Sequence, residues 1–291
     1  MFDDISYKKG CCILKMLMDE MGEDNFFGGL KLYMGRHEFG NTESKDLWRA
    51  FQDCGDPRVT DKMRVWTKEA GFPVVSVTED CAGGGSGPGE VVALRLHQKR
   101  FVVGGAGHDD GKEQIYPLRI SMRSETGIDI YDMEERETVI PAQGKTLLKI
   151  NADHSGFFRT SYTSNHLRKL TRAAVQGHLT LRDCIGLLAD LSALTATGMN
   201  KTSELLDLCL GFKSMTEFPV WQMIDRNLTK LVWIWKFEDS ILAGALAKFA
   251  ADILGLKAHE LGWTTSDADD ESQMIFQATM FGAAGLAGDL R

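Results

Sequence analysis

The sequence lacks the residue spacing with which proteins build a zinc site on one helix. Such a site needs two histidines at positions i and i+4, with a glutamate after the first as general base. Two His-Glu pairs are present, His37-Glu38 and His259-Glu260. The position four residues after the histidine is Asn41 in the first pair and Trp263 in the second, so neither pair has its second histidine. The remaining histidines are isolated: His97, His108, His154, His166 and His178. We therefore expect no metal ligands and no cofactor in this chain.

The cysteines also lack the Cys-x-x-Cys spacing of metal and redox sites. They are Cys11, Cys12, Cys54, Cys81, Cys184 and Cys209. Adjacent Cys11-Cys12 would point to different faces of a helix, and most of the others lie among apolar helical residues. This pattern favours reduced, packed thiols in a cytosolic protein, with a redox role as the alternative.

The sequence has no excess of positive charge and no long apolar run. Asp and Glu number 41 against 33 Lys and Arg, which gives a net charge of −8. Without a basic cluster we expect neither nucleic acid nor an anionic membrane as a partner. No apolar run approaches the length of a bilayer span, and no charged-then-apolar leader opens the sequence. We therefore predict a cytoplasmic protein.

Changes in hydrophobic period divide the 291 residues into three parts, in keeping with a chain too long for one small core. Residues 1–72 carry apolar residues at helical spacing, interrupted by glycines. We expect short helices here, the third capped by Asn41-Thr42 and the fourth by Thr60. Their apolar stripes are typical of ordinary core.

Residues 73–162 change to alternating or β-branched runs, which are typical of strands. These runs are residues 74–77, 91–96, 116–122, 137–140 and 147–150. We expect them to form a small β-sandwich, with loops at Gly83–Gly89 and Gly104–Gly107. A phosphate cradle is the alternative for these loops. The Lys-Ser/Thr ending of a P-loop is missing, however, and no helical pattern follows.

Residues 163–291 return to an almost continuous helical pattern. Helices of similar length joined by short polar turns suggest an α-solenoid, in which each helix pair buries its face against its neighbours. Asp183 and Asp190 share one face of a predicted helix, but carboxylates without a cleft or a partner base are weak evidence of hydrolysis. The charge runs Glu134–Glu137 and Asp267–Glu271 are typical of solvated surface.

Several motifs, taken in order, cover essentially the whole sequence. They are Phe2–Gly10, His37–Thr42 with Asp46–Trp48, Trp66–Val74, Gln98–Phe101, Ile115–Leu118, Asn151–Arg159, Leu261–Trp263 and Phe281–Asp289. Together they resemble the C-terminal portion of the gluzincin family of puromycin-sensitive and membrane alanyl zinc aminopeptidases, in particular its fungal members. The resemblance implies a multidomain α+β chain. Residues 1–72 would be the closing helices of a thermolysin-like catalytic domain, 73–162 a β-sandwich, and 163–291 a truncated solenoid of armadillo or HEAT type.

The resemblance also implies a role for Tyr7, which matches the tyrosine that stabilises the transition state in this family. The family's zinc motif lies upstream of that tyrosine. We therefore expect zinc and peptide substrates to belong to the intact enzyme, which removes N-terminal residues from peptides. This chain alone, opening at Met1, is expected to be inactive, and its uncovered apolar faces are expected to favour self-association. The alternative is a non-catalytic scaffold built from the same sandwich and solenoid.

Overall fold

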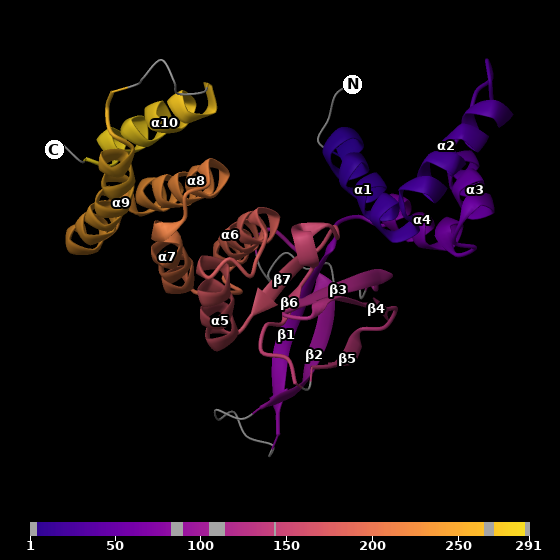
Figure 1. Cartoon of the computed structure of the whole chain (residues 1–291), viewed down its shortest axis with the longest axis horizontal. Helices are drawn as coiled ribbons and strands as arrows, with labels where there is room; N and C mark the ends of the chain where they lie inside the picture. Colours follow the sequence, from indigo (N-terminus) through magenta and orange to yellow (C-terminus); the bar gives the residue numbers. More distant parts are fainter. Residues whose placement is uncertain (1–4, 83–89, 105–113, 143, 265–270, 289–291) are drawn as a thin grey trace. The chain divides into compact units, whose positions relative to one another are not determined.

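A computed structural model describes residues 5–82, 90–104, 114–142, 144–264 and 271–288. It is a mixed α+β structure that falls into two compact units, Met1–Thr163 and Ser164–Arg291 (Figure 1). Each unit is described by itself below. The further division of the first unit at residue 72 stays a prediction. The expected loop at Gly83–Gly89 lies outside the described residues, as do all of the expected loop Gly104–Gly107 except Gly104 and most of the Asp267–Glu271 run.

The first unit opens with helices, as the hydrophobic spacing predicts. They are the π-helical turn η1 (Ile5–Lys9), α1 (Gly10–Met21), α2 (Glu23–Arg36), α3 (Ser44–Cys54) and α4 (Val59–Lys68). Gly22 separates α1 from α2 with a φ of 79°, a backbone conformation that favours glycine. Of the apolar residues at helical spacing in α1, Ile13, Leu17 and Met21 are buried, whereas Leu14 and Met18 are only partly buried.

Two predicted helix caps are wrong. α3 begins after Glu43 rather than after Asn41-Thr42, and the Asp46 carboxylate accepts a hydrogen bond from the Glu43 backbone N–H at 2.9 Å. Thr42 instead pairs with the Tyr33 phenol, 2.6 Å away. Thr60 lies inside α4, where its hydroxyl donates to Gln52 at 2.6 Å. A polar side chain caps a helix only when no other hydrogen-bond partner competes for it. The local sequence does not show which partners are within reach.

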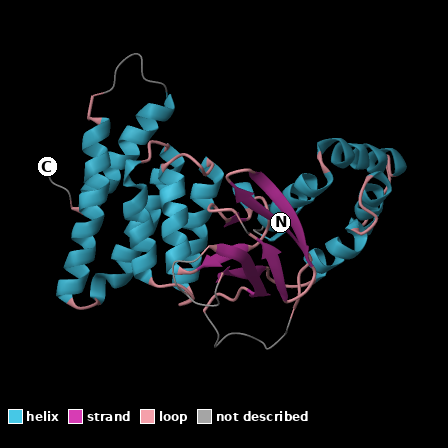
Figure 2. Cartoon of the chain, turned by 60° about the horizontal axis from the view of Figure 1, so that its bottom comes forward, coloured by secondary structure: helices cyan, strands magenta, loops and turns pink. Residues whose placement is uncertain are grey.

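The strands of the first unit form two small sheets (Figures 1 and 2). The strands are β1 (Pro73–Cys81), β2 (Val91–Arg100), β3 (Leu118–Ser124), β4 (Gly127–Met133), β5 (Glu137–Pro141), β6 (Lys149–Ile150) and β7 (Arg159–Tyr162). One sheet has the order β5-β2-β1-β7, in which only the β1–β7 pairing is parallel, and the other has the order β4-β3-β6. The turn η3 (Ala152–His154) lies between β6 and β7.

The helical and sheet parts of the first unit meet around two aromatic side chains. The rings of Trp66, on α4, and Tyr116, just before β3, lie 5.2 Å apart, and both residues are almost completely buried. The Tyr116 hydroxyl donates to the Ala70 carbonyl at 2.9 Å. Because a buried phenol needs such a partner, this bond fixes the chain that leaves α4 against the start of the second sheet.

The second unit is helical throughout its described part (Figure 2). Its elements are α5 (Ser164–Val175), α6 (Leu181–Ala196), α7 (Thr202–Gly211), η4 (Phe212–Ser214), α8 (Phe218–Ile234), η5 (Trp235–Phe237), α9 (Ser240–Leu261) and α10 (Glu271–Ala287). Helices close in sequence pack on one another: α7 against α5 and α6, α8 against α6 and α9, and α10 against α8 and α9. Of the apolar residues at helical spacing from Val220 to Trp235, Val220, Trp221, Ile224, Leu228 and Leu231 are buried, whereas Val232 and Trp235 are only partly buried.

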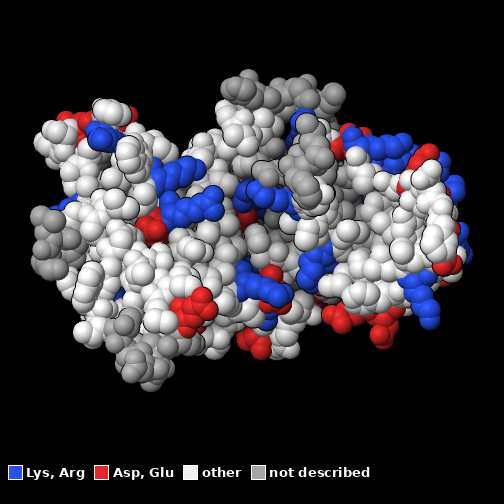
Figure 3. Space-filling view, turned by 90° about the horizontal axis from the view of Figure 1, so that it is seen from above, with Lys and Arg blue, Asp and Glu red and all other residues white. Residues whose placement is uncertain are grey.

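Surface charge is mixed in sign. On the face in Figure 3, Lys and Arg side chains lie in separate groups with Asp and Glu side chains among them. Among the helices that the structure describes, none is both long enough and apolar enough to cross a bilayer.

Candidate functional site

Tyr7 lies on the exposed turn η1, directly before α1, and is 54 % exposed. Turns of the π type are rare and occur frequently at functional sites, because the widened helix displaces a side chain from its regular position. The neighbouring Lys9 ammonium holds this turn in place by donating to the carbonyl oxygens of Glu69 at 3.3 Å and Gly71 at 3.4 Å. Burial lowers the pKa of Lys9 below its ordinary value.

A second contact fixes α1, and with it the turn that bears Tyr7. The Lys62 ammonium on α4 pairs with Glu20 on α1 and with Asp56 at 3.2 Å. The side chains of Lys62 and Glu20 are only 11 % and 9 % exposed. Burial alone would lower the pKa of Lys62, but the hydrogen bonds and charges of Glu20 and Asp56 outweigh it and raise the pKa. Removing either partner would leave a buried charge uncompensated.

Residues of the two His-Glu pairs contact aromatic and charged side chains of the fold. His37 follows the last residue of α2, and its ring lies 5.5 Å from the ring of Tyr33. Near the end of α9, Glu260 pairs at 2.8 Å with Lys257, whose ammonium lies 4.9 Å from the Trp221 ring centroid. Within the described residues, no group of three or more His, Cys, Asp or Glu side chains is arranged to hold a metal ion.

Two of the acidic residues that the sequence singles out, Asp183 and Glu134, have structural partners. Asp183 and Asp190 are both buried in α6. The Asp183 carboxylate accepts from the Thr180 backbone N–H at 3.2 Å, and the Thr180 hydroxyl accepts from the Asp183 N–H at 3.2 Å, so the two residues form a capping box. In the run from Glu134 to Glu137, Glu134 pairs with Arg58 at 2.9 Å.

The prediction of packed thiols is confirmed for only part of the set. Cys184 and Cys209 are buried, and burial raises the pKa of Cys209 to about 12. Cys11 and Cys12 are exposed, so the prediction is wrong for this pair. Both cysteines lie in the first turn of α1, whose buried residues are Ile13, Met16, Leu17 and Met21. Two adjacent residues point to different faces of a helix, but neither of these two faces is the buried one.

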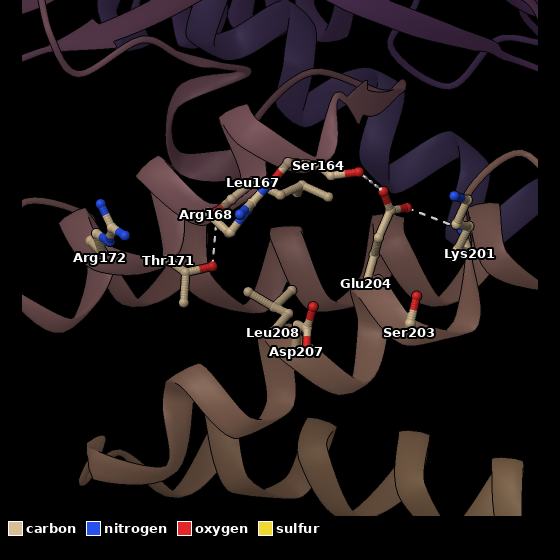
Figure 4. Close-up of a pocket in the computed structure, with 10 residues that line it drawn as sticks. All are labelled: Ser164, Leu167, Arg168, Thr171, Arg172, Lys201, Ser203, Glu204, Asp207 and Leu208. Atoms are coloured by element: carbon tan, nitrogen blue, oxygen red, sulfur yellow. Dashed lines mark hydrogen bonds between the residues drawn. The ribbon is translucent and has the colours of Figure 1, made fainter. Parts of the chain in front are cut away.

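The sequence analysis missed a pocket between α5 and α7, with a volume of about 450 Å³ (Figure 4). Three basic side chains line it: Arg168 and Arg172 of α5, and Lys201, the residue just before α7. The spacing of the two arginines, four residues apart, was a visible signal of a shared helix face. The pairing of that face with α7 was not visible, because it depends on tertiary packing.

Glu204 ties the two walls of this pocket together. Its carboxylate accepts from the Ser164 hydroxyl, from the Asn200 amide at 2.9 Å and from the Lys201 backbone N–H at 3.0 Å. Figure 4 shows the Ser164 hydroxyl directed at this carboxylate. Burial acts to raise the pKa of Glu204, but these hydrogen bonds outweigh it and lower the pKa below its ordinary value. Glu204 is therefore a structural acceptor that joins the starts of α5 and α7.

Two family domains match this chain. Residues 1–66 match the Peptidase family M1 domain, and residues 147–291 match the ERAP1-like C-terminal domain. Tyr7 and its anchor Lys9 lie in the first of these stretches. The helices α5 to α10 lie in the second.

Curated relatives match along nearly the whole chain. Alanine/arginine aminopeptidase of Saccharomyces cerevisiae is 34 % identical over 289 residues, which are 99 % of this chain and 32 % of that protein. Aminopeptidase 2, mitochondrial, of the same yeast is 33 % identical over 99 % of this chain and 29 % of its own length. Puromycin-sensitive aminopeptidase of Caenorhabditis elegans is 24 % identical over 99 % of this chain and 30 % of its length.

The matched domains and the names of these relatives define a class, the peptidases that act at peptide N-termini. The chain belongs to peptidase family M1, and it matches the C-terminal portion of these zinc aminopeptidases. It spans about a third of the length of the curated relatives that it matches.

Proposed function

We propose that this chain supplies a hydrogen-bond donor, Tyr7, to a zinc-dependent aminopeptidase that removes N-terminal residues from peptides. Membership of peptidase family M1 is the observation that carries the proposal. Support comes from the position of Tyr7 on an exposed π-helical turn whose backbone is anchored through Lys9. The matches to peptidases do not favour a non-catalytic scaffold.

The proposed role follows from the chemistry of a phenol. At neutral pH it stays protonated and donates one hydrogen bond. Donated to the oxygen of the scissile carbonyl, that bond strengthens as the oxygen gains negative charge. Because the gain is larger in the transition state than in the bound substrate, Tyr7 lowers the barrier to reaction without tightening substrate binding.

Tyr7→Phe in the full-length protein tests this role. We expect kcat to fall by about 100-fold to 1000-fold, the usual cost of one oxyanion donor, with KM nearly unchanged. The aromatic ring remains, so folding should be unaffected. The control is Tyr33→Phe, which removes a phenol bonded to Thr42 at 2.6 Å and should keep kcat. A normal kcat for Tyr7→Phe, or a defect wholly in KM, would show that Tyr7 only packs.

We also propose that zinc is bound by the intact enzyme and not by these 291 residues. Asn41 and Trp263 at the positions where a second histidine is needed support this assignment. The isolated chain should hold no stoichiometric zinc after dialysis and should not hydrolyse aminoacyl-arylamides. One tightly held zinc per chain in metal analysis would overturn the assignment.

Three finer features of the predicted organisation remain proposals. We propose that the two sheets pack face to face as a β-sandwich, and that α5 to α10 form the start of an α-solenoid. The packing of each helix on near neighbours in sequence supports the solenoid. We also propose a cytoplasmic location. One relative is named as mitochondrial, so fractionation of cells that produce the full-length protein is the test.

A further inference from the structure

A second pocket of the helical unit, lined by residues of α6, α7, α8 and η5, has a volume of about 250 Å³. Its walls are mainly apolar and include Leu205, Leu231 and Trp235. A volume of this size corresponds to about eight water molecules at about 30 Å³ each, or to one small organic molecule. The pocket lies within one compact unit and shares no lining residue with the pocket between α5 and α7.

Two buried polar atoms at this pocket have no hydrogen-bond partner within the described part of the chain. They are the Nδ2 atom of Asn227, a residue only 3 % exposed, and the Oγ1 atom of Thr195. Asn227 belongs to α8 and Thr195 to α6, so the unsatisfied atoms come from facing walls. Buried side-chain donors without a partner are uncommon in folded proteins, because each loses its bonds to water. Something that accepts hydrogen bonds would satisfy both atoms.

The charge at this pocket is of one sign. Lys230 lines it, one turn along α8 from Asn227, and takes part in no ion pair with another described residue. No Asp or Glu is among the described residues that line the pocket. The polar groups at the pocket are thus an amide nitrogen, hydroxyls and an ammonium, which together favour an anion over a cation.

We propose that this pocket binds a small monocarboxylate with an apolar body. The carboxylate accepts hydrogen bonds from Asn227 Nδ2 and Thr195 Oγ1 and pairs with the Lys230 ammonium. The body of the ligand packs on Leu205 and Trp235, as is usual in ligand sites with a few placed polar groups. A free amino acid is disfavoured, because its α-ammonium would find no carboxylate in the pocket and would be repelled by Lys230.

Phenylacetate is the probe, titrated into the full 291-residue chain and followed by ligand-observed NMR. We expect saturable binding in the low-millimolar range or below, as the size of the probe allows. The neutral isostere phenylacetamide and the zwitterion phenylalanine should each bind at least about tenfold more weakly. The absence of saturable phenylacetate binding, or equal binding of phenylacetamide, would overturn the proposal and indicate a water-filled cavity.

Variants locate the binding. Thr195→Val and Asn227→Leu should each weaken phenylacetate binding about tenfold or more, and Lys230→Met should remove the preference over phenylacetamide. Lys213→Met, an exposed lysine outside the pocket, is the matched control and should bind like the wild type. Without ligand, Asn227→Leu should raise the melting temperature, because it removes an unsatisfied buried amide. Unchanged binding in both Thr195→Val and Asn227→Leu would place the ligand elsewhere and overturn the assignment.

Discussion

Both polar atoms of the Asn151 side chain form hydrogen bonds with the backbone of Gly156. Its Oδ1 accepts from the Gly156 N–H at 2.8 Å, and its Nδ2 donates to the Gly156 carbonyl at 3.1 Å and to the Phe158 carbonyl at 3.3 Å. Asn151 is fully buried and has a φ of 62°. The left-handed conformation is costly for most residues but is tolerated by asparagine. This one side chain therefore organises the loop between β6 and β7.

Replacing Asn151 should destabilise the first unit. Asn151→Ala loses three hydrogen bonds, leaves buried backbone groups unsatisfied and strains the positive φ, so we expect a loss of about 3 kcal/mol in the free energy of unfolding. Asn151→Gly relieves the strain but not the lost bonds, and should fall between alanine and the wild type. Urea denaturation measures both. The control is Asn165→Ala on the exposed face of α5, which should be nearly neutral. An Asn151→Ala protein as stable as this control would contradict the role.

Glu125 should make stability depend on pH. Its carboxylate accepts from the Thr146 N–H and hydroxyl, each at 2.7 Å, and from the Leu147 N–H at 3.2 Å. Partial burial acts to raise the pKa, but hydrogen bonds from its own backbone N–H, from Thr146 and from Leu147 lower it from 4.5 to about 2. Because the folded pKa lies below the unfolded one, the stabilisation is present above about pH 4.5 and is lost as the pH falls toward 2.

Unfolding by urea at several pH values between neutrality and acid measures this dependence. Glu125→Gln should be less stable than the wild type at neutral pH, and the difference should shrink in acid. Glu135→Gln, at another exposed glutamate, is the matched control and should follow the wild-type curve. A difference between Glu125→Gln and the wild type that stays constant with pH would exclude the linkage.

The cysteines should react in the order of their exposure. Iodoacetamide acts on the thiolate, so the exposed Cys11 should be alkylated first at mildly alkaline pH. Cys12 should follow more slowly, because burial and the neighbouring Cys11 raise its pKa. Cys209, with a pKa of about 12, should remain unmodified until the protein unfolds. Peptide mass spectrometry measures each site, and labelling in denaturant is the control. Early modification of Cys209 would show that α7 opens readily.

Self-association should depend on the turn between α8 and α9. Trp233, Phe237 and Ile241 are 67 %, 90 % and 82 % exposed, and Lys236 lies over the rings of the first two. Exposed apolar groups gathered in one place favour association. The double variant Phe237→Ser, Ile241→Ser should therefore shift sedimentation at micromolar concentration toward the monomer. Val103→Ser, at an exposed apolar residue in the other unit, should not. A wild-type chain that is already a clean monomer would contradict the prediction.

Hydrophobic periodicity determined most of the helices, and motif resemblance determined the family. Period 3.6 places Met63 and Trp66 inside α4, and both are buried. It fails for α2, where Phe27 and Met34 also stand at helical spacing with the other apolar residues but are 58 % and 65 % exposed. Periodicity reports that a face is apolar, whereas burial requires another element to cover that face.

The strands show the same limit. All five expected runs overlap strands, but β4 and β7 were not predicted. β4 is an edge strand in the order β4-β3-β6, and its Ile128 and Ile130 are each 46 % exposed. β7 is only four residues long and is paired in parallel with β1, far away in sequence. Such strands are defined by the partner that supplies their hydrogen bonds, and local sequence does not name that partner.

The candidate sites divide along the same line. The sequence alone pointed to Tyr7, because the motif around it is one continuous stretch of residues. Such a motif can be recognised without a structure. Only the tertiary structure joined Thr195 of α6 with Asn227 and Lys230 of α8 at one pocket, and Ser164 with Glu204 at the other. Residues tens of positions apart meet through helix packing, and the lack of a partner for a buried amide is visible only when all of its neighbours are in place.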